Sequence, residues 1–163
     1  MVVSVQEADF DVGAEIAALS AGDGETGAVA SFVGVVRADQ LVQAAELGAG
    51  VTAPPIGMVQ AMTLEHYPGM TEQALQEIID QARSRWSLRR LRVIHRVGRL
   101  MPGERIVFVG VGSAHRGDAF AACEFIMDYL KTRAPFWKKE ETPAGGRWVD
   151  ARETDEQAAE RWK

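Results

Sequence analysis

Apolar residues that recur at three- and four-residue steps predict two long helices. In residues 118–133, Ile126 and Leu130 belong to one apolar stripe, and Pro135 ends the helix. The second helix begins near Thr71, directly after a Tyr-Pro-Gly turn, and keeps its helical period to residue 86. Each helix therefore has one face that must be buried against another part of the protein.

Two shorter helices are predicted near the ends of the chain. Asp11 is a suitable N-cap for a helix over residues 12–20. At the other end, Thr154 and Gln157 resemble a capping box that opens a last short helix. The apolar face of that helix includes Trp162, which must be buried either on the protein's own sheet or on a second copy of the chain.

Runs of β-branched residues, some alternating with polar ones, predict the strands of a sheet. In residues 90–97 the alternation predicts a strand with one buried face, and that face includes His95. The end of the chain predicts a hairpin between residues 136–140 and 147–151. Further strands are predicted at residues 2–5, 28–36, 58–66 and 105–112. Strands and helices in this mixed order indicate an α+β fold.

The length and the cysteine usage indicate one domain that folds without disulfides. The chain has 163 residues, enough to bury a core of its own. Its single cysteine, Cys123, has no partner for an internal disulfide and lies among alanines in a predicted helix. We therefore expect Cys123 to be a small buried apolar residue rather than a reactive thiol.

Targeting signals and overall charge restrict the location and the partners. The first ten residues show no basic leader or apolar core, and no later run approaches the roughly 20 apolar residues of a membrane span. A cytoplasmic protein without a membrane partner is expected. The formal net charge of −5 argues against a general nucleic-acid binder, which needs a broad basic face.

Positive charge is nevertheless concentrated in the segment around the helix at residues 118–133. His115 and Arg116 come directly before its first turn, where free backbone N–H groups and the helix dipole favour an anion. Their side chains add further donors, so this helix start predicts a phosphate site.

The other end of the same helix carries a second group of cations. Lys131 lies in the last turn, and Lys138 and Lys139 follow Pro135 in an extended segment that also contains Trp137. Cations in a last turn commonly do no more than complement the helix dipole. In combination with aromatic neighbours, however, they fit a pocket for a small anionic ligand with a flat ring.

Two isolated polar residues have more than one interpretation. Arg37, at the end of an apolar strand, is either a solvated strand terminus or a ligand contact at the rim of a sheet. His95 is either a hydrogen-bonded core residue or a ligand. A metal site is disfavoured, because the histidines and Cys123 show none of the short spacings of metal-binding motifs.

Three motifs carry a resemblance to a known family. They are HYPGM at residues 66–70, SAHR at residues 113–116 and LKTRAPFWK at residues 130–138, and GRWVDARETDEQAAERW continues the match at residues 146–162. Together they closely resemble the large, catalytic subunits of molybdopterin synthase, over nearly the whole chain.

The resemblance implies a fold, an assembly and a reaction. The fold is a single α/β-hammerhead domain with a mixed or antiparallel sheet and an added β-hairpin subdomain. The assembly is a homodimer within a heterotetramer, in which a small ubiquitin-like sulfur-carrier subunit inserts its C-terminal tail into each active site. The reaction transfers two sulfurs from the thiocarboxylate of that tail to cyclic pyranopterin monophosphate, which becomes molybdopterin, and it needs no further cofactor.

The resemblance also implies functional residues. Lys131 is the first candidate for catalysis, as an acid/base, an amine nucleophile or the holder of an oxyanion, and Lys138 is the second. The implied substrate-binding residues are Val35, Val36, Arg37, His115, Arg116, Lys131, Lys138, Lys139, Glu140 and, from a neighbouring subunit, Arg152.

One region departs from the family pattern. Residues 38–57 are expected to form an inserted loop where relatives have a short connection, and surface insertions of this kind cost little free energy. Two non-catalytic interpretations stay open beside the enzyme. One is a module that binds a pterin or a phosphate without Lys131, and the other is a module that recognises a ubiquitin-like tail without a pterin.

Overall fold

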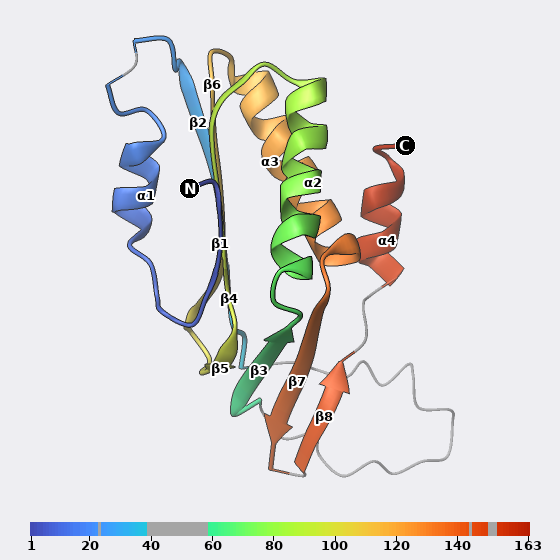
Figure 1. Ribbon diagram of the computed structural model, residues 1–163. Helices are drawn as coiled ribbons and strands as arrows, with labels where there is room; N and C mark the ends of the chain where they lie inside the picture. Colours follow the sequence, from blue (N-terminus) through green and yellow to red (C-terminus); the bar gives the residue numbers. More distant parts are fainter. Residues whose placement is uncertain (23, 39–58, 144, 150–152) are drawn as a thin grey trace.

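The computed structural model describes residues 1–22, 24–38, 59–143, 145–149 and 153–163. The predicted loop at residues 38–57 lies, apart from Ala38, outside the described residues, as does Arg152. In chain order the elements are β1 (Val3–Gln6), α1 (Val12–Ala18), β2 (Ala28–Val35), β3 (Ala61–His66), α2 (Met70–Arg85), β4 (Leu88–Arg96), β5 (Gly98–Leu100), β6 (Arg105–Ser113), α3 (Arg116–Arg133), β7 (Phe136–Thr142), β8 (Gly145–Val149) and α4 (Glu153–Glu160) (Figure 1).

The described strands form two four-stranded sheets. The first has the order β1-β4-β6-β2 and the second the order β5-β3-β7-β8. The first sheet is mixed, because β1 is parallel to β4 while β6 is antiparallel to both β4 and β2. The second sheet is antiparallel throughout. The predicted α+β class is therefore confirmed.

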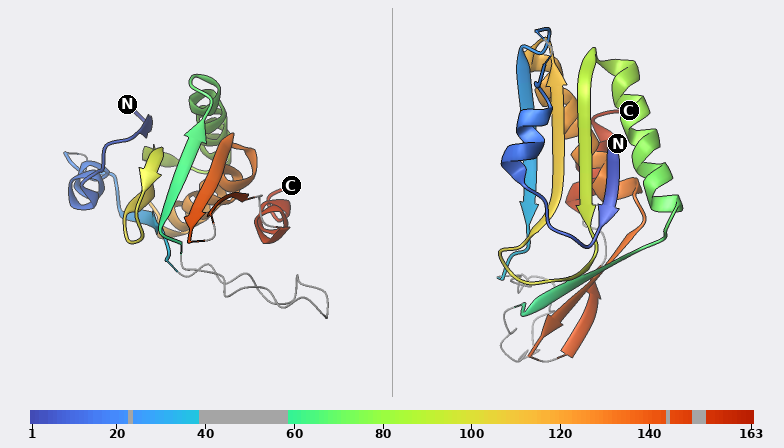
Figure 2. Two further views of the ribbon diagram at one scale, coloured as in Figure 1. Left: turned by 90° about the horizontal axis from the view of Figure 1, so that it is seen from below. Right: turned by 60° about the vertical axis from the view of Figure 1, so that its left-hand side comes forward.

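Helices cover both faces of the first sheet. Figures 1 and 2 show α2 and α3 on one face and α1 on the other, with the second sheet beyond one end of the first. The prediction that residues 90–97 bury only one face was wrong. Ile94, on the face toward α1, is fully buried and packs with Phe10, Leu19 and Phe108. Docking of α1 is a tertiary event that the alternation within one strand does not reveal.

The second sheet contains the predicted hairpin. In the pair β7 and β8, Lys138 lies opposite Val149 and Glu140 lies opposite Arg147. The short strand β5 was not predicted, because three residues are too few to show a period. It is separated from β4 by a bend at Val97 and Gly98, where Gly98 has a φ of 82°, a backbone conformation that glycine adopts without strain.

The helix boundaries differ from the predictions at two places. Helix α3 begins at Arg116, two residues earlier than predicted, because His115 is the last residue in an extended conformation. Helix α4 begins at Glu153, so Thr154 lies inside its first turn and the predicted capping box was wrong. The N-cap of α1 at Asp11 is confirmed by a hydrogen bond of 3.0 Å from the Ala14 N–H to its side chain.

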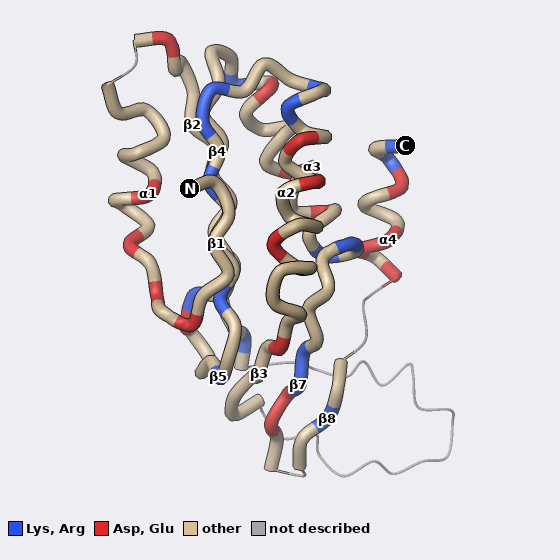
Figure 3. Tube along the Cα trace, in the orientation of Figure 1, with Lys and Arg blue, Asp and Glu red and all other residues tan. Residues whose placement is uncertain are grey.

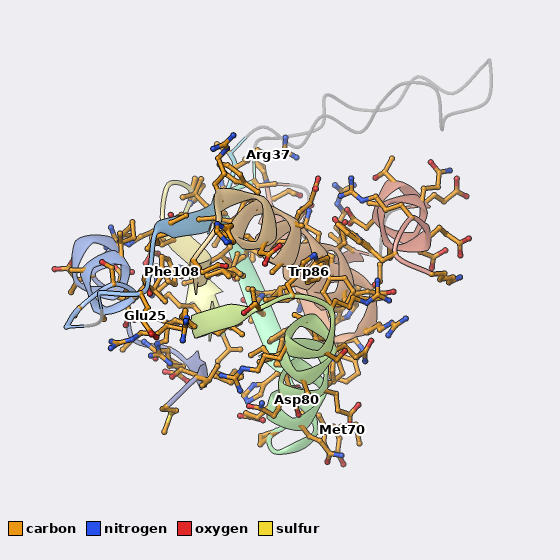
Figure 4. All side chains as sticks on the ribbon, turned by 90° about the horizontal axis from the view of Figure 1, so that it is seen from above. Glu25, Arg37, Met70, Asp80, Trp86 and Phe108 are labelled. Atoms are coloured by element: carbon orange, nitrogen blue, oxygen red, sulfur yellow. The ribbon has the colours of Figure 1, made fainter. Side chains whose placement is uncertain are left out.

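Trp162 packs on helices of its own chain. Its ring lies 5.7 Å from the ring of Trp86 and 5.5 Å from that of Phe125, with edge-to-face geometry. It therefore contacts α3 and the end of α2 rather than the sheet, the first of the two predicted places. Figure 4 shows Trp86 on the side of the first sheet where α2 and α3 lie, and Phe108 on the side of α1. None of the helices in the described ranges is long and apolar enough to cross a membrane.

Candidate active site

A cavity of about 610 Å³ lies where the C-terminal end of α3 meets the edge strand β2 and the second sheet. Its walls come mainly from β2, β3, β6, β7 and the last two turns of α3. Met62, Leu64, Ile106, Leu130 and Phe136 make much of this wall apolar. An apolar cavity with a few polar groups is the usual form of a site for a small organic ligand.

Three cations reach this cavity from separate elements. Arg37 follows β2, Lys131 lies in the last turn of α3, and Lys138 lies on β7. Pro135 ends α3 between the two lysines and turns the chain into β7, which brings both lysines to the same cavity. Together with Val35, these residues are the part of the predicted site that one chain brings together.

The end of β2 is shaped by an irregularity in its pairing. The register with β6 shifts between Gly34 and Val35, and Val35 is 52% exposed and lines the cavity. Val36 lies in the core instead, and its N–H and C=O both take part in backbone hydrogen bonds, with Glu104 and Gly103. Val36 therefore supports its neighbours and offers no free group to a ligand.

Each of the two lysines has an acidic neighbour, and sequence reasoning missed one of the two, Asp155. The Lys131 Nζ lies 3.5 Å from Asp155 Oδ1 of α4, and Asp155 also lines the cavity. The Lys138 Nζ lies 4.0 Å from Glu140 Oε1. Asp155 is far from Lys131 in the sequence, so no local pattern relates the two residues.

Two other predicted site residues do not line this cavity. Lys139 points to the opposite face of β7, with its Nζ 5.8 Å from the ring centre of Trp148. Glu140 lies on the same face as Lys138 but is 0% exposed and accepts hydrogen bonds from Arg147. A ligand in the cavity is therefore contacted by Lys138 before either of these residues.

His95 forms part of the cavity wall. Its Nδ1–H donates to the carbonyl oxygen of Arg96 at 2.8 Å, and its ring stacks on Phe136 at 3.8 Å between centroids and 18° between planes. The expectation of a hydrogen-bonded, buried histidine is thus confirmed. Burial lowers the pKa of His95 from its ordinary value of 6.5 to about 4, so the ring is neutral at pH 7.

We expect acid to destabilise the protein through His95. Between pH 6.5 and about 4 the unfolded chain binds a proton at this residue and the folded protein does not. The stabilisation is therefore fully present above pH 6.5 and is lost as the pH falls toward 4, a difference of about 3 kcal/mol in unfolding free energy. Urea unfolding at pH 7.5 and at pH 4.5 measures it.

The control for this prediction is His95→Gln, which keeps a polar side chain but does not titrate. The variant should lose about 2 to 3 kcal/mol less unfolding free energy than the wild type between the two pH values. All other titrating groups, including Asp9 with a pKa of about 2, are common to both proteins. Equal losses in the two proteins would show that the His95 ring is protonated in the folded state.

His115 and Arg116 line a second cavity, of about 470 Å³, at the N-terminal end of α3. Gly27 lies beside it, and a Cβ at that position would meet the carbonyl oxygen of Ala114 at 2.4 Å. Only glycine therefore allows the start of β2 to approach the residues before α3. The exposed His115 and Arg116 side chains and the free N–H groups of the helix start retain the geometry predicted for a phosphate site.

The two groups of cations are far apart in one chain. At about 1.5 Å of rise per residue, Arg116 and Lys131 are separated by about 22 Å along the axis of α3. A small ligand cannot contact both groups within a single chain. The substrate-binding residues that the resemblance implies at the two ends of α3 therefore line separate cavities within one chain.

The described residues include neither a group of side chains arranged to hold a metal ion nor a reactive thiol. No group of three or more His, Cys, Asp or Glu side chains in this part of the chain is arranged to hold a metal ion. Burial raises the pKa of Cys123 to about 11, so the thiol is not ionised at pH 7. The prediction of Cys123 as a buried apolar residue is confirmed.

Comparisons with known proteins agree with the motifs and with the fold. The model of the MoaE protein family matches residues 5–133. The molybdopterin synthase catalytic subunit of Ralstonia nicotianae is 60% identical over 160 residues, which cover 98% of this chain and 83% of that protein. The chain belongs to the MoaE family of molybdopterin synthase catalytic subunits. Membership in this family makes it an enzyme subunit of molybdenum cofactor biosynthesis.

Solved structures of MoaE proteins share the architecture. The molybdopterin biosynthesis MoaE protein from Burkholderia ambifaria is 52% identical, has a TM-score of 0.76, and covers 99% of this chain with 97% of its own. A protein–protein complex of subunits 1 and 2 of the molybdopterin-converting factor from Helicobacter pylori has a TM-score of 0.71 at 18% identity, with 93% and 92% covered. That second likeness shows the fold alone.

Proposed function

We propose that this MoaE subunit transfers two sulfurs to cyclic pyranopterin monophosphate and so forms the dithiolene of molybdopterin. The sulfurs come from the C-terminal thiocarboxylate of a small ubiquitin-like subunit, one per round of binding. The observation that carries the proposal is the convergence of Lys131, Lys138 and Arg37 on one largely apolar cavity. The apolar wall suits the flat pterin ring, and the cations suit its phosphate and the thiocarboxylate.

Lys131 is the proposed catalytic residue. Its ammonium group is half exposed at the cavity, where it can bind the thiocarboxylate or a tetrahedral oxyanion and can give or accept a proton. Asp155 forms an ion pair of 3.5 Å with it. Because this pair is partly exposed, the negatively charged tail of the small subunit can replace Asp155 at little cost.

Lys138 and Arg37 are the proposed contacts for the substrate. Lys138 is less exposed than Lys131 and lies beside Phe136, which is in position to support a flat ring. Arg37 lines the cavity from the end of β2, where a guanidinium can bind phosphate oxygens in a bidentate manner. Val35 lines the wall next to it.

A homodimer is proposed because His115 and Arg116 lie too far from Lys131 in one chain. A second copy related by two-fold symmetry can place its helix start against this cavity and complete the site. Two exposed aromatic side chains support this face as the contact, namely Phe32 of the edge strand β2, 41% exposed, and Phe120, 66% exposed and one turn from Arg116. Arg152 is proposed to reach across the same dimer.

The small subunit is the proposed second partner, in a heterotetramer with two copies of each chain. The Helicobacter pylori structure is a complex of the two subunits of the molybdopterin-converting factor, and its chain has the same fold as this one. The cavity offers cations to an anionic tail, which is the recognition chemistry the proposal needs. We place the reaction in the cytoplasm.

Reconstitution tests the proposed function. Purified protein is mixed with the thiocarboxylated small subunit and cyclic pyranopterin monophosphate, and molybdopterin is quantified by mass spectrometry. We expect product from this mixture and none when the small subunit ends in an ordinary carboxylate. Absence of product, with binding of the small subunit shown separately, would favour a module that only recognises the tail.

A further inference from the structure

A row of side chains on β7 and β8 continues beyond the cavity. Phe136, Lys138 and Glu140 alternate along β7 and share one face of the second sheet. On β8, Val149 lies opposite Lys138, and Arg147 lies opposite Glu140. Figure 3 shows the basic and then the acidic positions along β7, and the basic position on β8. Glu140 and Arg147 are thus the next pair along this face after Lys138 and Val149, which line the cavity.

Glu140 has a buried carboxylate in which only one of the two oxygens accepts hydrogen bonds. The side chain is 0% exposed. Its Oε2 accepts hydrogen bonds from Arg147 Nε at 3.2 Å and from Nη2 at 2.9 Å. Its Oε1 is buried and has no hydrogen-bond partner within the described part of the chain, and the Lys138 Nζ lies 4.0 Å from it. A buried oxygen without a hydrogen bond is costly and therefore calls for an explanation.

We propose that Glu140 and Arg147 form a positioning pair that holds the ammonium group of Lys138 at the cavity. Arg147 binds one carboxylate oxygen with two donors, which fixes the plane of the carboxylate. The other oxygen then faces Lys138 from behind and directs its Nζ toward a bound ligand. The inference rests on the proposed function, because it assigns the two residues a part in that reaction through Lys138.

The pair also determines the chemical role of Lys138. A carboxylate held 4.0 Å away stabilises the charged form of the lysine. The other titratable groups that line the cavity are Arg37, His95, Lys131 and Asp155. Of these, Asp155 pairs with Lys131, and Glu140 is the acidic group that lies 4.0 Å from Lys138. Lys138 therefore acts as a fixed cation toward a phosphate or an oxyanion, and not as a neutral amine.

The simpler explanation is that the pair only joins β7 to β8. A matched pair on the opposite face of β7 separates the two explanations. There, Glu141 accepts hydrogen bonds from Arg99 of β5, at 2.9 Å from Nη2. Arg99 and Glu141 join β7 to the other side of the sheet without facing the cavity. Variants of this pair control for the loss of an Arg–Glu contact as such.

Kinetics provide the first test. In the reconstituted reaction, Glu140→Gln should lower kcat about 10- to 100-fold and change the KM for the pterin less than about threefold, because a misplaced Lys138 no longer faces the oxyanion that develops in the chemical step. Arg147→Gln should lower kcat about tenfold, and Arg147→Lys should recover part of that loss. Arg99→Gln and Glu141→Gln should keep the wild-type kcat. Equal effects of the cavity-side and control variants would overturn the proposal.

Titration of Lys138 provides a second test that needs no turnover. The lysines are labelled by reductive methylation with ¹³C, the Lys138 signal is assigned with Lys138→Arg, and its pKa is measured by NMR. The pKa of Lys138 should fall in Glu140→Gln and remain at the wild-type value in Glu141→Gln. An unchanged pKa in Glu140→Gln would refute the positioning pair even if the wild type makes molybdopterin. A wild type that makes none, with the pKa lowered as expected, would instead refute the proposed function alone.

Discussion

Lys131→Ala is expected to lower kcat for sulfur transfer by about 100- to 1000-fold, the range found when one donor to a developing oxyanion is removed. Lys131 is half exposed at the end of α3, so its loss leaves no cavity in the core. Asp155 loses its ion pair with Lys131 but remains partly exposed to water. The fold should therefore persist while the chemistry fails, and single-turnover formation of molybdopterin measures the effect.

Two further variants determine what Lys131 does. Lys131→Arg keeps the positive charge but cannot release a proton near pH 7, so it retains activity only if the residue acts through its charge. Arg133→Ala removes a cation two residues away whose guanidinium lies 3.7 Å from the centre of the Tyr129 ring. Arg133 does not line the cavity, so this variant should keep the wild-type kcat.

Binding measurements complete the test of Lys131. Lys131→Ala should still bind the small subunit and the pterin, as shown by calorimetry, because Lys138 and Arg37 remain in the cavity. Full sulfur transfer by this variant, with the small subunit bound, would show that Lys131 is not catalytic. Catalysis would then have to be assigned to another residue of the proposed site, with Lys138 as the next candidate.

Local patterns predicted the elements of this fold well, and they failed where tertiary contacts decide. The helical periods before Pro135 and after Thr71, and the final hairpin, are properties of short segments and were confirmed. The second buried face at Ile94 depends on the docking of α1 and was missed. Strand β5 was missed because it is short and is defined by its pairing with β3.

The candidate site shows the same division. The shared cavity of Lys131 and Lys138 follows from the end of α3 before Pro135 and the start of β7 directly after it, so sequence reasoning placed the two together. The ion pairs of Lys131 with Asp155 and of Glu140 with Arg147 join residues of different elements. The spacing of these residues in the sequence does not predict either pair. His95 was expected to be a buried residue, and only the fold shows that it also lines the cavity.

A dimer that combines Lys131→Ala and Arg116→Ala should be active although each homodimer is inactive. In the proposed dimer, each site uses Lys131 of one copy and Arg116 of the other. The mixed dimer therefore contains one site with both lesions and one intact site. Copies with two different affinity tags, purified in tandem after co-expression, should show about half of the wild-type turnover.

The matched control is a mixed dimer of Lys131→Ala and Lys138→Ala. Both lysines line the same cavity of one chain, so each site of this dimer carries one lesion and it should be inactive. If each chain instead formed a complete site, both mixed dimers would be inactive, because every site would contain a lesion. Activity in the first dimer but not in the second can arise only if the two ends of α3, about 22 Å apart in one chain, meet across the dimer.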